Sequence, residues 1–525
     1  MKFVEGHTVG IDLGTSYSVV ARLDEDGEAT VLENAQGRLV TPSIVILADD
    51  GLVIVGPSQE RVVKEQPDRV VTAIKRKMGD ASFELYHEKR RLTPELISSM
   101  ILTKLRQDAE KHVKPVTNAV ITVPHYFNEP KRQATRHAGR IAGLNVIDII
   151  NEPTAATLAY AWQKGELGNP DLPGKERTVL VYDLGGGTFD VTIVRYTPTQ
   201  FTVLATDGDT MLGGIDWTER LADHVARKFE EKFGLDPRTE PMAKKNLLIE
   251  AESAKRELSL WEKSTVTLTF RGQTLELEVN RTTFEDLTHD LLQRTQDTTE
   301  FTIDHTGVDP RKLDTVLLVG GSSTMPAVAA MLEKLTGKPP SRELNPQTAV
   351  AQGAAIHAAI LEAKHGSSSS ESVRSLERRL RNVSTTDVNS HSLGVEITDR
   401  NDPNIKLNHV MIPRNSRLPV RKLQRFQTTS HAPQSIHVRL LEGEATDVSS
   451  CTFIGDFRLV GLPQDLPKGS PVEIIYTYDA RGHIHVSLKE VTGNHQCVVE
   501  IAWSHGLDET AIDALTRLAA DYRVE

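Results

Sequence analysis

The first 360 residues alternate between short apolar runs of strand type and longer segments with the spacing of helices. The runs at 119–123 (AVITV) and 146–150 (VIDII) are each followed by a helix-starting signal, Asn128 in one case and Pro153 in the other. Strands that alternate with helices predict a parallel sheet with helices packed on its faces. We therefore expect an α/β fold for this part of the chain.

The pattern changes in the last third of the chain. After Asp387, short strand-like runs at 435–441, 472–478 and 483–488 are separated by Gly, Pro, Asn and Asp, which predicts an antiparallel β-sandwich. Before it, four consecutive serines and a charged run have the composition of a flexible linker. The expected organisation is an α/β domain over 1–364, a linker over 365–386, the sandwich over 387–505 and a short C-terminal helix within 506–525.

Two near-copies of one motif stand in the α/β part, GIDLGT at 10–15 and YDLGGGT at 182–188. In each copy a strand-like run ends in an aspartate, Asp12 or Asp183, and is followed by glycines, a threonine and a second strand-like run. Glycines let the backbone turn tightly and bring bare N–H groups close to a ligand. A single copy fits an ordinary hairpin turn equally well, but the repeat favours two loops that grip the β- and γ-phosphates of a nucleotide, with the aspartates holding Mg²⁺ through its waters.

Further segments closely resemble the seventy-kilodalton heat-shock (Hsp70) chaperone family of the DnaK type. They are VPHYFN (123–128), RQAT (132–135), AGRIAGL (138–144), INEPTAA (150–156) and LVGG (318–321). The resemblance runs through about the first 360 residues and returns, more weakly, in the C-terminal third. It implies an actin-like ATPase fold with two ribonuclease-H-like lobes, ATP or ADP in the cleft between them, and a peptide-binding β-sandwich.

The same resemblance implies a set of site residues. Lys75 matches the family's lysine that holds the attacking water and the γ-phosphate, while Glu152 and Asp183 match the groups that orient that water and the lysine. Thr15 and Thr188 match hydroxyl groups that donate hydrogen bonds to phosphate oxygens. Such donors help to offset the phosphate charge, as ATP hydrolysis requires. The carboxylates on the metal side are Asp12, Asp183 and Asp190. The remaining nucleotide contacts are Gly14, Ser16, Gly185, Gly186, Gly187, Gly213, Gly214, Gly320, Gly321 and Ser322 around the phosphates and ribose, and Glu252, Lys255, Arg256 and Ser259, spaced along one helix face, around the nucleoside.

In the C-terminal third the resemblance rests on SLGVE (392–396), LEGE (441–444) and the run that begins at Asp479. By that alignment Val395, Phe426 and Ile436 lie near the groove that receives an extended hydrophobic segment, although each fits a plain core position as well. Such a groove works through backbone hydrogen bonds along a strand edge and an apolar pocket, so it recognises extended apolar chain rather than one sequence.

The chain departs from the family pattern on both sides of the nucleotide. Thr324 stands where the family commonly has an arginine over the adenine, so one face of the base is expected to lose a stacked guanidinium. The stretch from Phe83 to Leu92 is shorter than in the family, which trims part of the first lobe. Asp148 occupies a position where the family often has a basic residue that docks a J-domain partner.

The linker and the end of the chain also differ. The linker lacks the family's adjacent leucines and has Glu377, Arg378, Arg379 and Arg381 instead. Because charged groups are costly to bury unpaired, we expect this linker not to dock and the two domains to be weakly coupled. The chain stops at Glu525, where family members continue into a long helical lid, so we expect a short, lidless member.

The composition of the chain excludes some classes of binding partner. The formal charge of −11 over 525 residues carries no basic stripe, which argues against nucleic acid. Residues 1–7 contain no apolar leader segment and no 18 apolar residues run together, so we expect no membrane partner and a cytoplasmic location. The two cysteines, Cys451 and Cys497, fit a reducing compartment.

Together these observations predict an ATP-hydrolysing chaperone that binds extended unfolded segments, with a J-domain co-chaperone and a nucleotide exchange factor as further partners. The alternative is a nucleotide-regulated binding module or scaffold, in which the ATPase-like domain switches a sandwich that recognises one fixed protein partner. Filament-forming proteins and sugar kinases share the actin-like fold, but neither class explains the attached sandwich.

Overall fold

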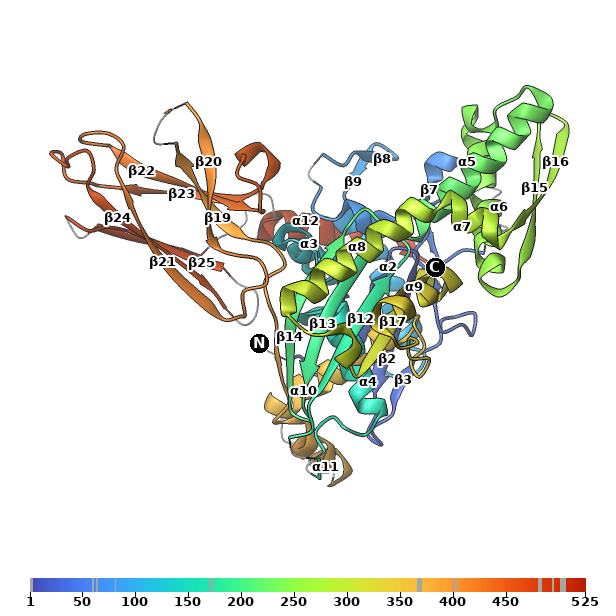
Figure 1. Cartoon of the computed structure of the whole chain (residues 1–525), viewed down its shortest axis with the longest axis horizontal. Coiled ribbons are helices and arrows are strands. Elements are labelled where there is room, and N and C mark those ends of the chain that lie inside the picture. The colour runs from blue at the N-terminus through green and yellow to red at the C-terminus, as the bar shows by residue number, and fades with distance from the viewer. Residues whose placement is uncertain are drawn as a thin grey trace.

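Two sheets with the same strand arrangement form the centre of the first 360 residues of this computed structural model (Figure 1). In each sheet an antiparallel hairpin is extended on one side by an antiparallel strand and on the other by a parallel one. This repeat agrees with the duplicated sequence motif. The structure describes residues 3–525 except 59–60, 63–64, 81, 170, 173, 366–370, 400–401, 403, 480–483, 493–494 and 501–506; for 371–374 and 495–500 only the backbone is described.

The first lobe contains the sheet β11-β10-β1-β2-β3, in which β1, β10 and β11 run parallel. The helix α3 begins where the sequence predicts, since Asn128 caps it by accepting a hydrogen bond from the Lys131 N–H; Thr93 caps α2 in the same way. Its elements are β1 (His7–Asp12), β2 (Tyr17–Leu23), β3 (Ala29–Val31), β4 (Thr41–Pro42), β5 (Val45–Leu47), β6 (Leu52–Val55), β7 (Val70–Val71), β8 (Leu85–His87), β9 (Arg90–Leu92), α2 (Pro94–Ala109), β10 (Val116–Val123), α3 (Glu129–Ile141), β11 (Asn145–Asn151) and α4 (Glu152–Gln163), with 3-10 turns η1 (Pro67–Arg69) and η2 (Ile74–Lys77).

The second lobe contains the sheet β17-β12-β13-β14 and, at its far end, a helical extension with a hairpin. Its elements are β12 (Arg177–Leu184), β13 (Phe189–Tyr196), β14 (Gln200–Asp209), α5 (Gly214–Phe233), α6 (Pro241–Leu260), β15 (Lys263–Phe270), β16 (Gln273–Asn280), α7 (Arg281–Leu287), α8 (His289–Thr306), β17 (Thr315–Val319) and α9 (Pro326–Thr336). The helix α10 (Ala349–His365) then returns to the first lobe and packs on β1, β2 and α4. Gly353 permits this close crossing, because a Cβ there would lie 1.8 Å from the Ala155 carbonyl oxygen.

The last third folds as the predicted antiparallel sandwich of two four-stranded sheets, β20-β19-β22-β23 and β21-β24-β25-β26. Buried side chains of both sheets, among them Leu440, Tyr476 and Leu488, meet in one core. Its strands are β19 (Leu393–Thr398), β20 (Lys406–Ile412), β21 (Val420–Gln427), β22 (Ser435–Glu442), β23 (Thr452–Val460), β24 (Pro471–Tyr478), β25 (Ile484–Glu490) and β26 (His495–Glu500).

Residues 371–386, the described part of the segment expected to be a free linker, are docked, so the expectation that the linker does not dock is wrong. They contain the helix α11 (Glu371–Leu380) and the strand β18 (Ser384–Thr386), which joins the second-lobe sheet parallel to β14. The arginines do not need to be buried unpaired: Arg379 donates to the Leu167 carbonyl at 2.8 Å and lies over the Trp162 ring, and Arg381 donates to the Ala363 carbonyl at 3.1 Å.

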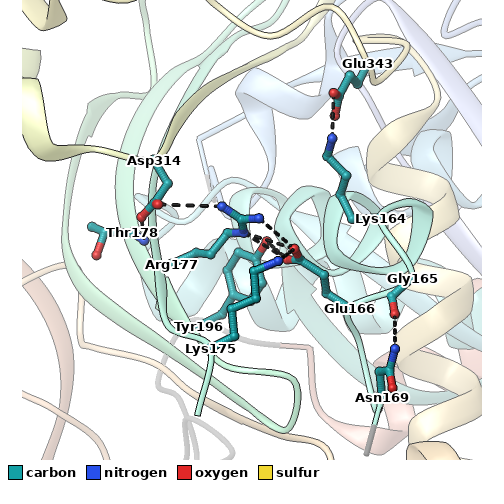
Figure 2. A network of polar contacts seen from close by, with 10 residues as sticks. All are labelled: Lys164, Gly165, Glu166, Asn169, Lys175, Arg177, Thr178, Tyr196, Asp314 and Glu343. Carbon is teal, nitrogen blue, oxygen red and sulfur yellow. Dashed lines mark hydrogen bonds and ion pairs between the residues drawn. The ribbon is translucent and has the colours of Figure 1, made fainter. Parts of the chain in front are cut away.

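The loop that receives Arg379 is held by a polar network (Figure 2). Glu166 accepts hydrogen bonds from Arg177 at 2.8 Å and from the Tyr196 hydroxyl at 2.8 Å, and it pairs with Lys175 at 2.9 Å. Glu166 is buried, and although burial alone would raise its pKa, these partners lower the pKa to about 2. The carboxylate is therefore ionised and fixes the surface on which α11 lies.

The sandwich lies against the ATPase-like part, beside β14 and α3 (Figure 1). Arg414 pairs with Asp207 at 3.4 Å, the Asn415 side chain accepts from the Thr206 N–H at 3.0 Å, and His391 packs on Tyr126 with ring centroids 4.3 Å apart. These contacts connect the sandwich to both lobes, because Tyr126 belongs to the first lobe and Asp207 to the second.

The C-terminal helix α12 (Glu509–Ala520) does not close the end of the sandwich, as a remnant of a lid would. It packs on α3 and α2 of the first lobe, with Ile512 buried, and the strand β27 (Arg523–Val524) pairs parallel to β6. The Arg140 guanidinium forms two hydrogen bonds with Glu509, at 2.9 and 2.5 Å. The expected helix exists, but it is part of the first lobe. No helix among the described residues is both long and apolar enough to cross a membrane.

Candidate nucleotide-binding site

A cavity of about 300 Å³ lies between the two lobes, and both duplicated motifs open into it. The motifs form the turns of the hairpins β1–β2 and β12–β13. Most of the residues predicted to bind the nucleotide line this cavity: Asp12, Gly14, Thr15, Ser16, Lys75, Glu152, Asp183, Gly185, Gly186, Thr188, Gly214, Glu252, Lys255, Arg256, Ser259, Gly320, Gly321 and Ser322. Gly187, Gly213 and Asp190 are not among its lining residues.

The two glycine loops face each other at very short range. A Cβ at Gly186 would lie 2.0 Å from the Ser16 hydroxyl oxygen, and a Cβ at Gly187 would lie 2.4 Å from the Thr15 methyl group. A Cβ at Gly213 would lie 2.6 Å from the Gly187 nitrogen. Gly186 and Gly187 are therefore required by the close approach of side chains from the first lobe, and Gly213 by the close approach of the second glycine loop. Without side chains, the backbone of this loop can come close to a ligand.

Lys75 and Glu152 form a buried pair at one wall of the cavity. The Lys75 ammonium lies 2.6 Å from the Glu152 carboxylate, and both side chains are less than a tenth exposed. Burial alone would lower the pKa of Lys75, but the charges of Glu152, Asp12 and Asp183 raise it. The lysine is therefore held as a cation, with its position fixed by Glu152.

Three buried carboxylates gather beside this pair. Burial and the nearby Glu152 charge raise the pKa of Asp12 to about 7 and that of Asp190 to about 8, and burial also raises the pKa of Asp183. One oxygen of Asp183 is buried and has no hydrogen-bond partner among the described residues. An unsatisfied oxygen and mutually repelling carboxylates are what a cation would relieve, and oxygen ligands suit Mg²⁺.

The structure does not support a metal ion that is coordinated by protein side chains alone. In the part of the chain that the structure describes, no three His, Cys, Asp or Glu side chains could hold a metal ion together. Asp190 accepts a hydrogen bond from the Tyr126 N–H at 3.0 Å and lies further from the cavity. The donor set therefore fits Mg²⁺ held through water and phosphate oxygens, and Asp12 and Asp183, which line the cavity, are the residues that would hold it.

The residues predicted to surround the nucleoside lie on α6. Lys255 is buried and donates to the Gly214 carbonyl at 2.8 Å and to Glu252 at 2.6 Å. Glu252 in turn accepts from Arg256 at 2.8 Å, and Arg256 lies over the Tyr17 ring at 5.1 Å. The predicted spacing on one helix face therefore brings these side chains together.

Several residues that line the cavity were not predicted as site residues from the sequence. They are Tyr17, Ile215, Leu260, Val319, Thr324, Met325, Pro346, Gln347 and Val350, of which only Thr324 was discussed, as a departure from the family. Tyr17 directly follows the first loop, and that proximity was the available signal. The apolar residues in this set have no local sequence pattern, because an apolar residue that lines a cavity cannot be distinguished in the sequence from a residue of the core.

Outside the cavity, the predicted peptide-groove residues differ in exposure. Val395 is 1% exposed and belongs to the sandwich core, whereas Phe426 and Ile436 are half-buried and pack against that core. The edge of the Phe426 ring meets His409, with ring centroids 5.4 Å apart. Asp148, predicted from the family to alter partner docking, pairs with His357 at 2.9 Å.

Comparison with known proteins shows which family the chain resembles. A family model described as "Hsp70 protein" matches residues 8–88 and 79–525. The chain is 39% identical over 523 residues to "Chaperone protein DnaK" of Thermotoga petrophila, covering 98% of this chain and 83% of that protein. The protein of the same name from Thermotoga maritima is also 39% identical over 523 residues, with the same coverage, and that from Thermosipho africanus is 38% identical over 518 residues, covering 97% and 82%.

Proposed function

The chain belongs to the Hsp70 family, and from this premise we propose that it is an ATP-dependent chaperone that hydrolyses Mg-ATP in the interlobe cavity and binds extended unfolded polypeptide segments. The observation that carries the proposal is the cavity in which two facing glycine loops meet the Lys75–Glu152 pair. We propose a cytoplasmic location, with unfolded segments, a J-domain co-chaperone and an exchange factor as partners.

The chemistry follows from how the side chains are held. Phosphoryl transfer to water needs a positioned nucleophile and neutralised phosphate charge rather than covalent catalysis. Lys75 would hold the attacking water and the γ-phosphate, while Glu152, at 2.6 Å, fixes the lysine. The N–H groups of both loops and the hydroxyls of Thr15 and Thr188 would bind phosphate oxygens. Bound Mg²⁺ would neutralise charge on the phosphates.

The sandwich would bind peptide by adding an extended chain to an apolar groove near Phe426 and Ile436, whose side chains are half-buried. Val395 would support the groove from below, because it is buried in the core. Such binding tolerates many sequences. Single-turnover hydrolysis of Mg-ATP, together with fluorescence anisotropy of a panel of unrelated extended peptides, tests the proposal.

We expect phosphate release from ATP and comparable affinities for several unrelated apolar peptides. If ATP is hydrolysed but no unrelated peptide binds, the second candidate holds, in which the sandwich recognises one fixed protein partner. The observation that favours this second candidate is the polar strand in the connection between the domains, since β18 presents Ser384, Thr385 and Thr386. Absence of hydrolysis contradicts both candidates as ATPases.

We also propose that coupling between the domains is weak, for a different reason from the one the sequence suggested. The connecting strand docks on β14, so a route for coupling exists. The side chains of β18 are polar and half-exposed or exposed, but Leu380 and Val383 before it and Val388 after it are buried in the core of the lobes. A connecting segment that stays docked in every nucleotide state favours neither state, so it would transmit only a small coupling free energy.

A further inference from the structure

Arg76, the neighbour of Lys75, reaches across the cleft. Its side chain is 12% exposed, and it makes two short hydrogen bonds: Nε donates to the Gly187 carbonyl at 2.7 Å and Nη2 donates to the Asp216 carboxylate at 2.6 Å. Arg76 lies in η2 of the first lobe, whereas Gly187 and Asp216 belong to the second lobe. The guanidinium therefore connects the segment that carries Lys75 to the opposite wall of the nucleotide cavity.

The acceptors of Arg76 are themselves part of the phosphate-side framework. The same Asp216 oxygen accepts the Gly213 N–H at 2.7 Å, at the start of α5. The N–H groups of Gly214 and Ile215 then bond to the carbonyls of Gly185 and Gly186, at 2.9 and 2.8 Å. Through one carboxylate and one carbonyl, Arg76 is thus bonded to the second glycine loop and to the first turn of α5.

The segment that carries Arg76 is strained in a way that these bonds explain. Ala73, directly before η2, has φ +52° and ψ +30°, a left-handed conformation that is unfavourable for a residue with a Cβ. Such a conformation persists only where the surroundings over-determine it. Here η2 is held from both sides. Lys75 pairs with Glu152 within the first lobe, and Arg76 pairs with Asp216 of the second lobe.

We propose that Arg76 is a positioning residue for ATP hydrolysis, a latch between the lobes that sets the position of Lys75 relative to the second glycine loop. This inference rests on the proposed function, because it concerns the reaction in that cavity. A planar guanidinium can reach a carbonyl and a carboxylate at once, whereas a lysine at this position can satisfy only one of them at short range. The latch therefore requires arginine for full effect.

The test compares Arg76→Ala and Arg76→Lys with the wild type in the full chain. We expect Arg76→Ala to lower single-turnover hydrolysis at least tenfold with less than a threefold change in ATP affinity, and to accelerate release of N-methylanthraniloyl-ADP several-fold. Arg76→Lys should recover part of both effects. A merely structural role would lower the thermal unfolding temperature without this split between rate and affinity.

Arg220→Ala is the matched control, since Arg220 forms an exposed ion pair with Asp290 at the same 2.6 Å distance but within the second lobe. It should leave hydrolysis and ADP release unchanged. If Arg76→Ala hydrolyses ATP and releases the fluorescent ADP at wild-type rates, the proposal that Arg76 is a latch between the lobes is wrong. If the wild type itself does not hydrolyse ATP, the proposed function fails, and ADP release from Arg76→Ala still decides the latch.

Discussion

Thr324 is the single residue at which the nucleotide cavity differs most clearly from the family pattern. It lines the cavity, and its hydroxyl donates to the Gly321 carbonyl at 2.7 Å. In the proposed site, Arg256 on α6 would stack on one face of the base. A threonine would provide no cation–π attraction for the other face, so we propose that the base is held less tightly than between two guanidinium groups.

We predict that Thr324→Arg restores the second stacking contact. A cation–π interaction of about 0.5–2 kcal/mol corresponds to about 2- to 30-fold tighter ADP binding. Calorimetry and stopped-flow release of fluorescent ADP measure the change. Thr324→Ala is the control, because it removes only the hydroxyl and should change affinity little. Unchanged affinity and release in Thr324→Arg would mean that this side chain does not face the base.

Glu166 gives a residue-scale prediction about stability and pH. Glu166→Gln should lower the free energy of unfolding at pH 7 by about 1–3 kcal/mol, because Arg177 and Lys175 lose an ionised acceptor. The carboxyl has a pKa of about 2 when folded, below its ordinary value, so its stabilisation is complete above the ordinary value and is lost as pH falls towards 2. The difference from wild type should shrink over that range.

Glu343→Gln is the control in the same network (Figure 2), because Glu343 pairs with Lys164 at 2.7 Å but is half-exposed. It should change stability by less than about 0.5 kcal/mol. Urea unfolding at several pH values checks both variants. Equal effects of the two substitutions would show that burial of Glu166 does not strengthen its interactions.

At the scale of elements, some parts follow from local sequence and others do not. The two glycine loops and α3 were predicted because a cap, a proline or a glycine marks each of them. The docking of 371–386 was missed because a charged pattern was taken as solvated, whereas Arg379 and Arg381 found carbonyl acceptors on distant segments. Such pairings are set by tertiary structure and leave no periodic signal.

The end of the chain provides the element-scale prediction. Ile512 of α12 is 3% exposed against the first lobe, so Ile512→Ala should lower the stability of that lobe by about 2–5 kcal/mol. Hydrogen exchange should then accelerate in β6, whose Val55 N–H bonds to the Glu525 carbonyl. Asp513→Ala, on the exposed side of α12, should have little effect. Rapid exchange in wild-type β6 would contradict the packing of this segment.

At the scale of the whole molecule, the sandwich is attached to the ATPase part at both of its ends. β18 precedes it on β14 of the second lobe, and α12 with β27 follows it on the first lobe. Two attachments limit how far the sandwich can move when the nucleotide changes. The sequence resemblance predicted both domains, but it could not show this arrangement, because contacts between domains depend on surfaces that sequence patterns do not describe.

We therefore predict only modest nucleotide control of peptide binding. Release of a fluorescent extended peptide, followed by stopped flow, should be fast with ADP and change less than about fivefold with ATP, which corresponds to about 1 kcal/mol of coupling. Slow release with ADP and strong acceleration by ATP in the wild type would contradict weak coupling.

Single-turnover hydrolysis of Mg-ATP by Lys75→Ala tests most directly whether this cavity performs the reaction. Glu152 holds Lys75 at one wall of the cavity, where we propose that the phosphates bind, so loss of the lysine should remove transition-state stabilisation more than ground-state binding. We expect hydrolysis to be nearly abolished while ATP remains bound, with Lys77→Ala, an exposed neighbour, close to wild type. Hydrolysis at the wild-type rate in Lys75→Ala would contradict the assignment of this site.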